Sequence, residues 1–161
     1  MDPRVAPLAE MLRLNSRLFH NCLNDLTDEQ AQRRPSDSCN SAVFVAAHLV
    51  ESRHYILKTL GAERENPLER YTGGWKSIEQ ITEWPTLDAI RSGWTAVSAA
   101  LADRLAAITP TELDTSITTQ MPLETRTALG MLTFLVQHDS YHVGQLSLLR
   151  KYAGLPAMSY S

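Results

Sequence analysis

Apolar residues recur at intervals of three and four along four stretches of the chain, which is the spacing that places them on one face of an α-helix. The first stretch begins with Asp2 as the expected N-cap and Pro3 as the expected first helical residue. The second begins after a cap at Asn40 or Ser41 and ends at Gly61. The inward positions of these two predicted helices are Leu8, Leu12, Phe19, Cys22 and Leu26, then Ala42, Val45, Leu49, Ile56 and Leu60.

Two further helices are predicted in the second half of the chain. The third starts after Thr86, its expected cap, and stops at Pro110, whereas the fourth starts near Thr127 and stops before Gly154. Their apolar positions are Leu87, Ile90, Trp94, Val97, Leu101, Leu105 and Ile108, then Met131, Leu135, Leu146, Leu149 and Ala153.

Four apolar stripes are buried most simply against one another, so the sequence predicts an all-α fold, a four-helix bundle that forms a single domain over residues 1–161. No segment alternates between apolar and polar residues over a strand length, although Ser116 to Met121 has room for brief pairing. The loop from 62 to 85, between helices 2 and 3, is long for such a bundle, and long ordered loops are often functional. We expect this loop to cover a pocket with its aromatic residues, which are Tyr71, Trp75 and Trp84.

Polar side chains interrupt the apolar stripes at several positions. On the fourth predicted helix the inward series reads Met131, Leu135, His138, His142, Gln145 and Leu149. On the second predicted helix His48 borders the stripe, and on the first Asn15 interrupts it. Buried without partners, such groups would cost much of the stability of the fold. A shared polar pocket at one level of the bundle explains all of them together.

His138 and His142 are the basis of a metal-site prediction. A helix turns by about 100° per residue, so residues four apart lie within about 40° of each other and about 6 Å apart, close enough to share one ion. A third imidazole from His48 would leave an open coordination position, which a catalytic ion needs. His20 and His54 lie off the stripes, so we expect them to be solvated and not to bind the ion.

Less specific interpretations exist for each of these residues. A single histidine on an apolar face is most often a core or boundary residue. Asn15 alternatively fixes the register of its helix, as single polar residues do in coiled coils. Tryptophans in loops are more often packing anchors than substrate contacts. As site residues, Gln145 and Asn15 are the candidates to orient a bound water or substrate.

The composition narrows the expected partners. The net charge of -3 and the pI near 5.9 provide no basic face for nucleic acid or for an anionic membrane, so we expect neither partner. The chain shows no basic region followed by an apolar run and no stretch long enough to span a bilayer, so we expect a cytoplasmic protein. Two cysteines, Cys22 and Cys39, are too few for a disulfide framework.

One segment also carries a family resemblance. The sequence HDSYHVGQL from His138 to Leu146, followed by Leu149 and Gly154, resembles the C-terminal signature of the DinB-like (DinB/YfiT) superfamily of metalloenzymes. Earlier segments resemble the first loop and second helix of that family, namely LTDEQ at 26–30, Arg34-Pro35, Asn40-Ser41 and His48-Leu49. Together these segments extend over nearly the whole chain.

The resemblance implies a four-helix bundle that binds one divalent ion, zinc, nickel or iron, through His48, His138 and His142. Relatives include bacillithiol S-transferases and a mycothiol-dependent maleylpyruvate isomerase, in which a low-molecular-weight thiol is activated at the metal. The expected partners are therefore a small-molecule thiol, of the bacillithiol, mycothiol or glutathione type, and an electrophile. Self-association as a homodimer is a further expectation from the family.

Two mechanisms fit three neutral imidazoles around an ion with an open position. In one, a thiol displaces bound water and attacks an electrophile held under the long loop. In the other, the water ionises and hydrolyses an ester or amide. No carboxylate lies in the inward stripe to act as a general base, and Asp139 points about 100° away from His138, either behind the ligands or at the surface. We therefore favour thiol transfer, with hydrolysis or a non-catalytic metal- or ligand-binding role as the alternatives.

Overall fold

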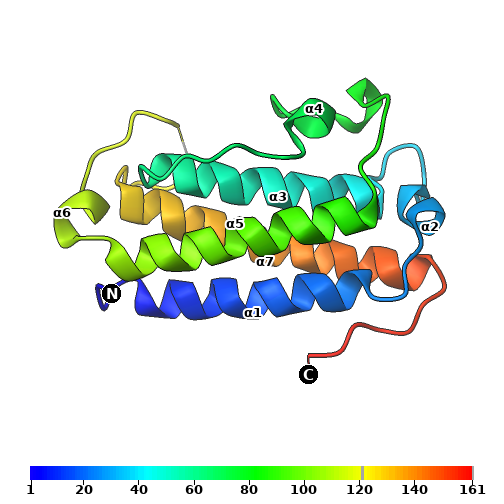
Figure 1. Ribbon diagram of the computed structural model, residues 1–161, viewed down its shortest axis with the longest axis horizontal. Helices are drawn as coiled ribbons and strands as arrows, with labels where there is room; N and C mark the ends of the chain where they lie inside the picture. Colours follow the sequence, from blue (N-terminus) through cyan, green and yellow to red (C-terminus); the bar gives the residue numbers. More distant parts are fainter. Residues whose placement is uncertain (121, 161) are drawn as a thin grey trace.

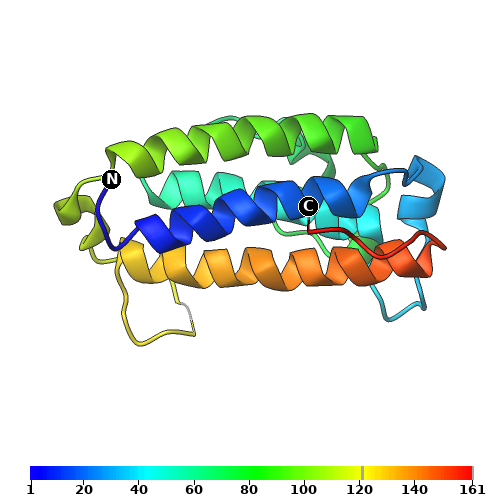
Figure 2. The same cartoon turned by 90° about the horizontal axis from the view of Figure 1, so that it is seen from below.

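The computed structural model describes residues 1–120 and 122–160, and within them the chain is helical apart from its connections, as predicted. Four long helices lie side by side in both views (Figure 1 and Figure 2). They are α1 (Ala6–Leu23), α3 (Ala42–Thr59), α5 (Leu87–Ala107) and α7 (Ala128–Tyr152). The connections contain the short helices α2 (Asp28–Gln32), α4 (Glu69–Thr72) and α6 (Pro110–Leu113) and the single 3-10 turn η1 (Ile78–Gln80).

Two of the long helices begin at predicted caps, Ser41 and Thr86, and α7 begins at Thr127, where the start of the fourth helix was predicted. The hydroxyls of Ser41, Thr86 and Thr127 each accept a hydrogen bond from the backbone N–H three residues later, which satisfies one of the unpaired donors of the first turn. α3 ends just before Gly61, whose φ of 72° is the left-handed conformation that stops a helix.

The start of α1 differs from the prediction. The Asp2 carboxylate accepts a hydrogen bond from the backbone N–H of Arg4 and pairs with its guanidinium, so it closes a turn and does not cap the helix. The helix begins at Ala6, and Pro7 in its first turn takes the place predicted for Pro3.

The direction of the helices explains the long loop. α1 and α7 run the same way, and α3 and α5 both run the opposite way (Figure 1). Because α5 starts at the end of the molecule where α3 also starts, the chain must return along the whole of α3, roughly 27 Å for 18 residues. The connection carrying α4 and η1 makes this return across α3.

The brief strand pairing predicted for the segment from Ser116 occurs at its first residue. Ser116 and Thr127 form an isolated antiparallel bridge just before α7. Met121, the last residue of the predicted segment, lies outside the described residues.

The core confirms the predicted stripes of α3 and α5, because every predicted position on both helices is buried. α7 has a wider buried face than predicted, since it packs against both α1 and α3. Additional buried residues on it are Leu132, Val136 and Val143. His138, His142 and Gln145 are therefore half-buried at the edge of the core, whereas the sequence predicted them at its centre.

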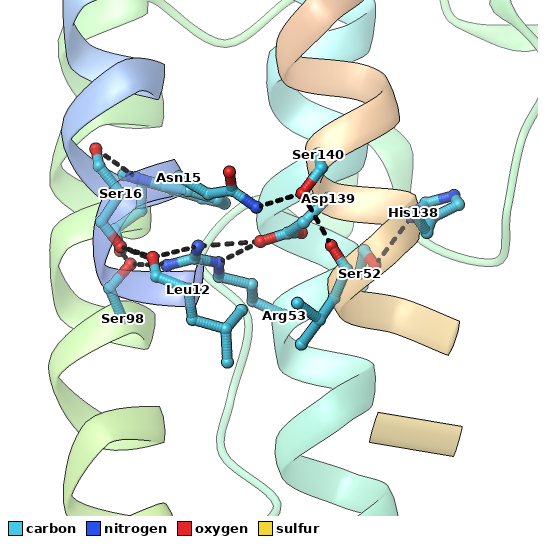
Figure 3. Close-up of polar contacts among 11 residues, drawn as sticks. Leu12, Asn15, Ser16, Ser52, Arg53, Ser98, His138, Asp139 and Ser140 are labelled. Carbon is cyan, nitrogen blue, oxygen red and sulfur yellow. Dashed lines mark hydrogen bonds and ion pairs between the residues drawn. The ribbon is translucent and has the colours of Figure 1, made fainter. Parts of the chain in front are cut away.

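A buried arginine joins all four long helices at one level (Figure 3). Arg53 of α3 donates from Nε and Nη2 to Oδ2 of Asp139 on α7, at 2.9 and 2.8 Å. Its Nη1 donates to the hydroxyls of Ser16 on α1 and Ser98 on α5, and its Nη2 donates to the carbonyl of Leu12. These contacts occupy all five N–H donors of the guanidinium. The ion pair holds α3 and α7 in register beside His138.

Candidate metal centre

Three imidazole rings from two helices converge at the edge of the core. His48 lies in the second turn of α3, and His138 and His142 lie one turn apart on α7. The Nε2 atom of His138 is 3.3 Å from Nε2 of His48 and 3.0 Å from Nε2 of His142. Potential ligand atoms of the three residues all lie within 4.8 Å of one another. The structure thus brings together the three histidines that the sequence singles out.

The spacing of these nitrogens fits a single ion. Two nitrogens that each lie about 2.0 Å from one tetrahedral ion are about 3.3 Å apart, which is close to both Nε2–Nε2 distances. Three neutral nitrogen donors suit zinc, nickel or iron, and they leave at least one coordination position for water or a substrate. The three-histidine cluster can therefore bind a metal ion.

Gln145 fixes the protonation of one of these rings. Its Oε1 lies 2.6 Å from Nδ1 of His142, and its Nε2 donates to the hydroxyl of Tyr141 at 3.2 Å. Because a carbonyl oxygen only accepts, Nδ1 of His142 must carry the hydrogen. The lone pair of this imidazole is then on Nε2, toward the other two rings. Gln145 thus contacts a histidine of the cluster, and its predicted role in orienting water or substrate stays a prediction.

Ser52 contacts the outer ring nitrogen of His138, as Gln145 contacts that of His142. Its Oγ lies 3.4 Å from Nδ1 of His138, across the α3–α7 interface (Figure 3). Metal-binding imidazoles commonly donate their second N–H in this way, which orients the ring. Ser52 was not among the predicted site residues, although its position four residues after His48 places both on the same face of α3.

Burial keeps the three rings neutral. Burial, followed by the nearby histidines, lowers the pKa of His48 to about 4 and that of His138 to about 4. Burial also lowers the pKa of His142, against the opposing effect of its hydrogen bond to Gln145. At neutral pH all three imidazoles have the unprotonated nitrogen that a metal requires.

Asn15 does not join this cluster. Its Nδ2 donates to Oγ of Ser140 at 2.9 Å, on the side of α7 away from His138 (Figure 3). The contact ties α1 to α7, as expected of a polar residue that fixes register.

Asp139 is not at the surface, which was one of the two predicted places for it. Its side chain is fully buried and paired with Arg53, and its Oδ1 has no hydrogen-bond partner. Burial raises the pKa of Asp139, while the Arg53 guanidinium acts in the opposite direction. The carboxylate therefore lies in the core behind the three histidines, where it is paired with Arg53.

The other two histidines lie elsewhere, but they are half-buried and not solvated as predicted. His20 contacts the hydroxyl of Thr95 at 3.3 Å, and its ring meets Phe19 edge-on. His54 faces a separate hollow lined also by Glu51 and Lys58. Within the described residues, only His48, His138 and His142 form a cluster able to hold an ion.

A cavity of about 350 Å³ opens beside the imidazoles, between α3 and α7. His48 and His138 form part of its wall, so a molecule in the cavity can reach the metal position. The described residues lining the rest of it are Ser52, Tyr55, Trp75, Thr119, Gln120, Met131, Phe134 and Leu135. None of these side chains carries a charge.

Trp75 covers one side of the site. Its ring meets His48 edge-on, with centroids 5.6 Å apart, and Tyr55 at 5.7 Å. The residue has a φ of 58°, which is uncommon for a bulky side chain, and its backbone N–H donates to the Glu51 carboxylate at 3.3 Å. The long loop thus contributes one aromatic residue to the site, whereas Tyr71 and Trp84 pack against the hydrophobic core.

None of the helices in the described part of the chain is both long enough and apolar enough to cross a membrane.

Comparison with known proteins identifies the family of this fold and site. Residues 11–146 match the DinB superfamily. The chain belongs to the DinB superfamily. The matched range includes all three histidines and Gln145, so the resemblance seen in the HDSYHVGQL segment is confirmed.

Solved structures share the fold over nearly the whole chain. A DinB-like protein from Bacillus cereus ATCC 10987 has 21% identity and a TM-score of 0.71, with 94% of each chain covered. A conserved protein from Enterococcus faecalis has 15% identity and a TM-score of 0.73, covering 92% of this chain and 96% of that one. A DinB-like protein from Bacillus subtilis has 15% identity and a TM-score of 0.64, covering 98% and 96%. At such identities the likeness to these structures shows the fold alone. A search of curated proteins found no match to the chain.

Proposed function

We propose that this DinB-superfamily protein is a cytoplasmic, metal-dependent thiol S-transferase built on a four-helix bundle. One observation carries the proposal: an open three-histidine site adjoins a cavity whose described lining residues include no carboxylate. A low-molecular-weight thiol of the bacillithiol, mycothiol or glutathione type is the proposed nucleophile, and the second substrate is an electrophile.

The proposed reaction gives separate roles to the histidines, to the residues that contact them and to the cavity. His48, His138 and His142 hold a divalent ion, zinc, nickel or iron, which when bound lowers the pKa of a coordinated thiol so that it reacts as a thiolate. Gln145 and Ser52 hold the outer N–H groups of two of the rings and so keep their lone pairs directed at the ion. The cavity holds the electrophile against the sulfur and excludes water from it.

The surroundings of the histidines favour a thiol over water as the nucleophile. Hydrolysis by bound water commonly uses a neighbouring carboxylate as general base. Asp139 is occupied by Arg53, and Glu51 accepts a hydrogen bond from the backbone of Trp75 and lines the separate hollow. A thiol needs no such base once it has ionised.

A conjugation assay tests the proposal. Bacillithiol, mycothiol and glutathione are each mixed with a chlorodinitrobenzene, using zinc-, nickel- and iron-loaded protein, chelated protein and loaded His142→Ala. In the expected reaction the sulfur electron pair forms a C–S bond, chloride leaves with the C–Cl bonding pair, and the thiol proton passes to buffer. We expect conjugation with at least one thiol, lost on chelation and in the variant.

Two other results would contradict thiol transfer. Metal-dependent hydrolysis of a simple ester without conjugation of any thiol would make the protein a hydrolase. If neither reaction occurs and chelation removes most of the folding stability, the ion is structural and the protein is a binding module.

A further inference from the structure

The cavity beside the histidines has a chemical character that restricts what it can hold. Its described lining consists of aromatic and aliphatic side chains, three neutral polar residues and the two imidazoles. Phe134 and Trp75 supply aromatic ring surface, and the buried side chains of Met131 and Leu135 supply aliphatic surface. Apolar surface of this kind favours ligands that lose little hydration on entry.

Among the described residues that line the cavity, none carries a charge that could compensate a charged ligand. Lys58 and Arg64 line the separate hollow, which lies beyond Tyr55 and Trp75. Lys76, which follows Trp75, donates from Nζ to the carbonyl of Tyr71 and is not among the lining residues of the cavity. Arg53 has every donor occupied inside the core. Transfer of a carboxylate or sulfonate from water into such a cavity is unfavourable unless a partner replaces its hydration.

The size of the cavity sets an upper limit on the ligand. An apolar cavity of roughly 150 Å³ is enough for benzene. A volume of about 350 Å³ therefore accommodates a substituted single ring or a fused pair of rings. The aromatic side chains that line the cavity can contact such rings edge-on or face-on.

We infer that the cavity lined by Trp75, Phe134 and Leu135 binds an uncharged aromatic molecule of one or two rings. In calling this molecule the electrophile of the reaction, the inference rests on the proposed thiol transfer. Trp75 and Phe134 are then the residues that determine specificity, because both supply ring surface to the cavity beside the histidines, with ring centroids 5.6 Å from His48 and 6.3 Å from His138 respectively.

A binding experiment that needs no catalysis tests the inference. Zinc-loaded protein is titrated calorimetrically with naphthamide and with naphthalene sulfonate, which has the same ring system but a charged group that is a poor metal ligand. We expect naphthamide to bind at least about tenfold more tightly than the sulfonate. Trp75→Ala should weaken naphthamide binding about tenfold, whereas Tyr152→Ala, which removes an equally exposed aromatic side chain elsewhere, should not.

A second variant tests the charge argument directly. Phe134→Arg places a cation in the cavity and should reverse the preference toward the sulfonate, whereas Thr133→Arg, on the exposed neighbouring position of α7, should leave both affinities unchanged. Far-UV circular dichroism and zinc content establish that each variant is folded. Equal binding of both probes to the unaltered protein, or unchanged naphthamide binding in Trp75→Ala, would overturn the inference. Selective naphthamide binding without any thiol conjugation would keep the inference and reject the proposed transferase.

Discussion

Oε1 of Gln145 lies 2.6 Å from Nδ1 of His142, one turn along α7. This contact forces the hydrogen of the imidazole onto Nδ1 and leaves Nε2 free to bind an ion. It also restricts rotation of the ring, because Gln145 is itself held by the hydroxyl of Tyr141. The amide thus holds His142 in the protonation state and orientation that metal binding would require.

Gln145→Leu should weaken zinc binding by about 10- to 100-fold, because the ligand loses the group that orients it. Competition with a chromophoric chelator measures the affinity. Gln137→Leu is the matched control, since Gln137 is an exposed glutamine on the same helix. If both variants bind zinc as the unaltered protein does, the hydrogen bond to His142 has no part in metal binding.

The Arg53–Asp139 pair should be essential to the fold. Arg53→Met leaves the Asp139 carboxylate buried without its partner, so the free energy of unfolding should fall by about 3–5 kcal/mol. Arg53→Met combined with Asp139→Leu should recover most of that loss, because no unpaired charge remains. Urea denaturation of zinc-free protein measures both. Breaking the exposed pair of Arg13 and Glu10 should have no measurable effect on the free energy of unfolding. A comparable loss of stability there would show that burial of the Arg53–Asp139 pair does not explain its contribution.

The helices could be predicted from the sequence because the apolar spacing and the capping residues that define a helix lie within or beside that helix. Apolar residues at steps of three and four predict the buried face of α5, and Thr86 and Thr127 mark where α5 and α7 begin. The pairing of His138 with His142 follows equally from the helical period. That His48 would meet them across α3 and α7 was suggested by the stripes, and the family resemblance assigned it as a ligand.

Other parts of the site depend on contacts that no local pattern specifies. Arg53 stands at a stripe position between Leu49 and Ile56, which was a usable signal, but a charged residue in a helix is usually solvated. Asp139 becomes buried because α7 has neighbours on two sides, which its own sequence does not reveal. Trp75 reaches His48 through the backbone conformation of a long connection, which no residue spacing specifies.

The stability of the metal-free protein should depend on pH through the histidines. His48 and His138 have pKa values lowered to about 4 by burial, below the usual 6.5 that applies to the unfolded chain. Between these values the unfolded state binds more protons than the folded state, so stability should be constant above about pH 7 and should decrease as the pH falls from 6.5 toward 4.

Urea denaturation in the presence of a chelator, repeated across this pH range, measures the dependence. His48→Gln removes one of the titrating groups and should reduce the slope, whereas Gln137→Leu should leave it unchanged. An unaltered slope in His48→Gln would mean that His48 titrates alike in the folded and unfolded chains.

The most direct measurement is the metal content of the protein and its single histidine variants. After dialysis against buffered zinc, elemental analysis should find about one ion per chain, and about a tenth of that or less in His48→Ala, His138→Ala and His142→Ala, because each change removes one of three ligands. His20→Ala and His54→Ala should retain the full ion, since neither belongs to the cluster. Full occupancy in any one of the three cluster variants, with its folding verified by circular dichroism, would contradict the assignment of these histidines as the metal site.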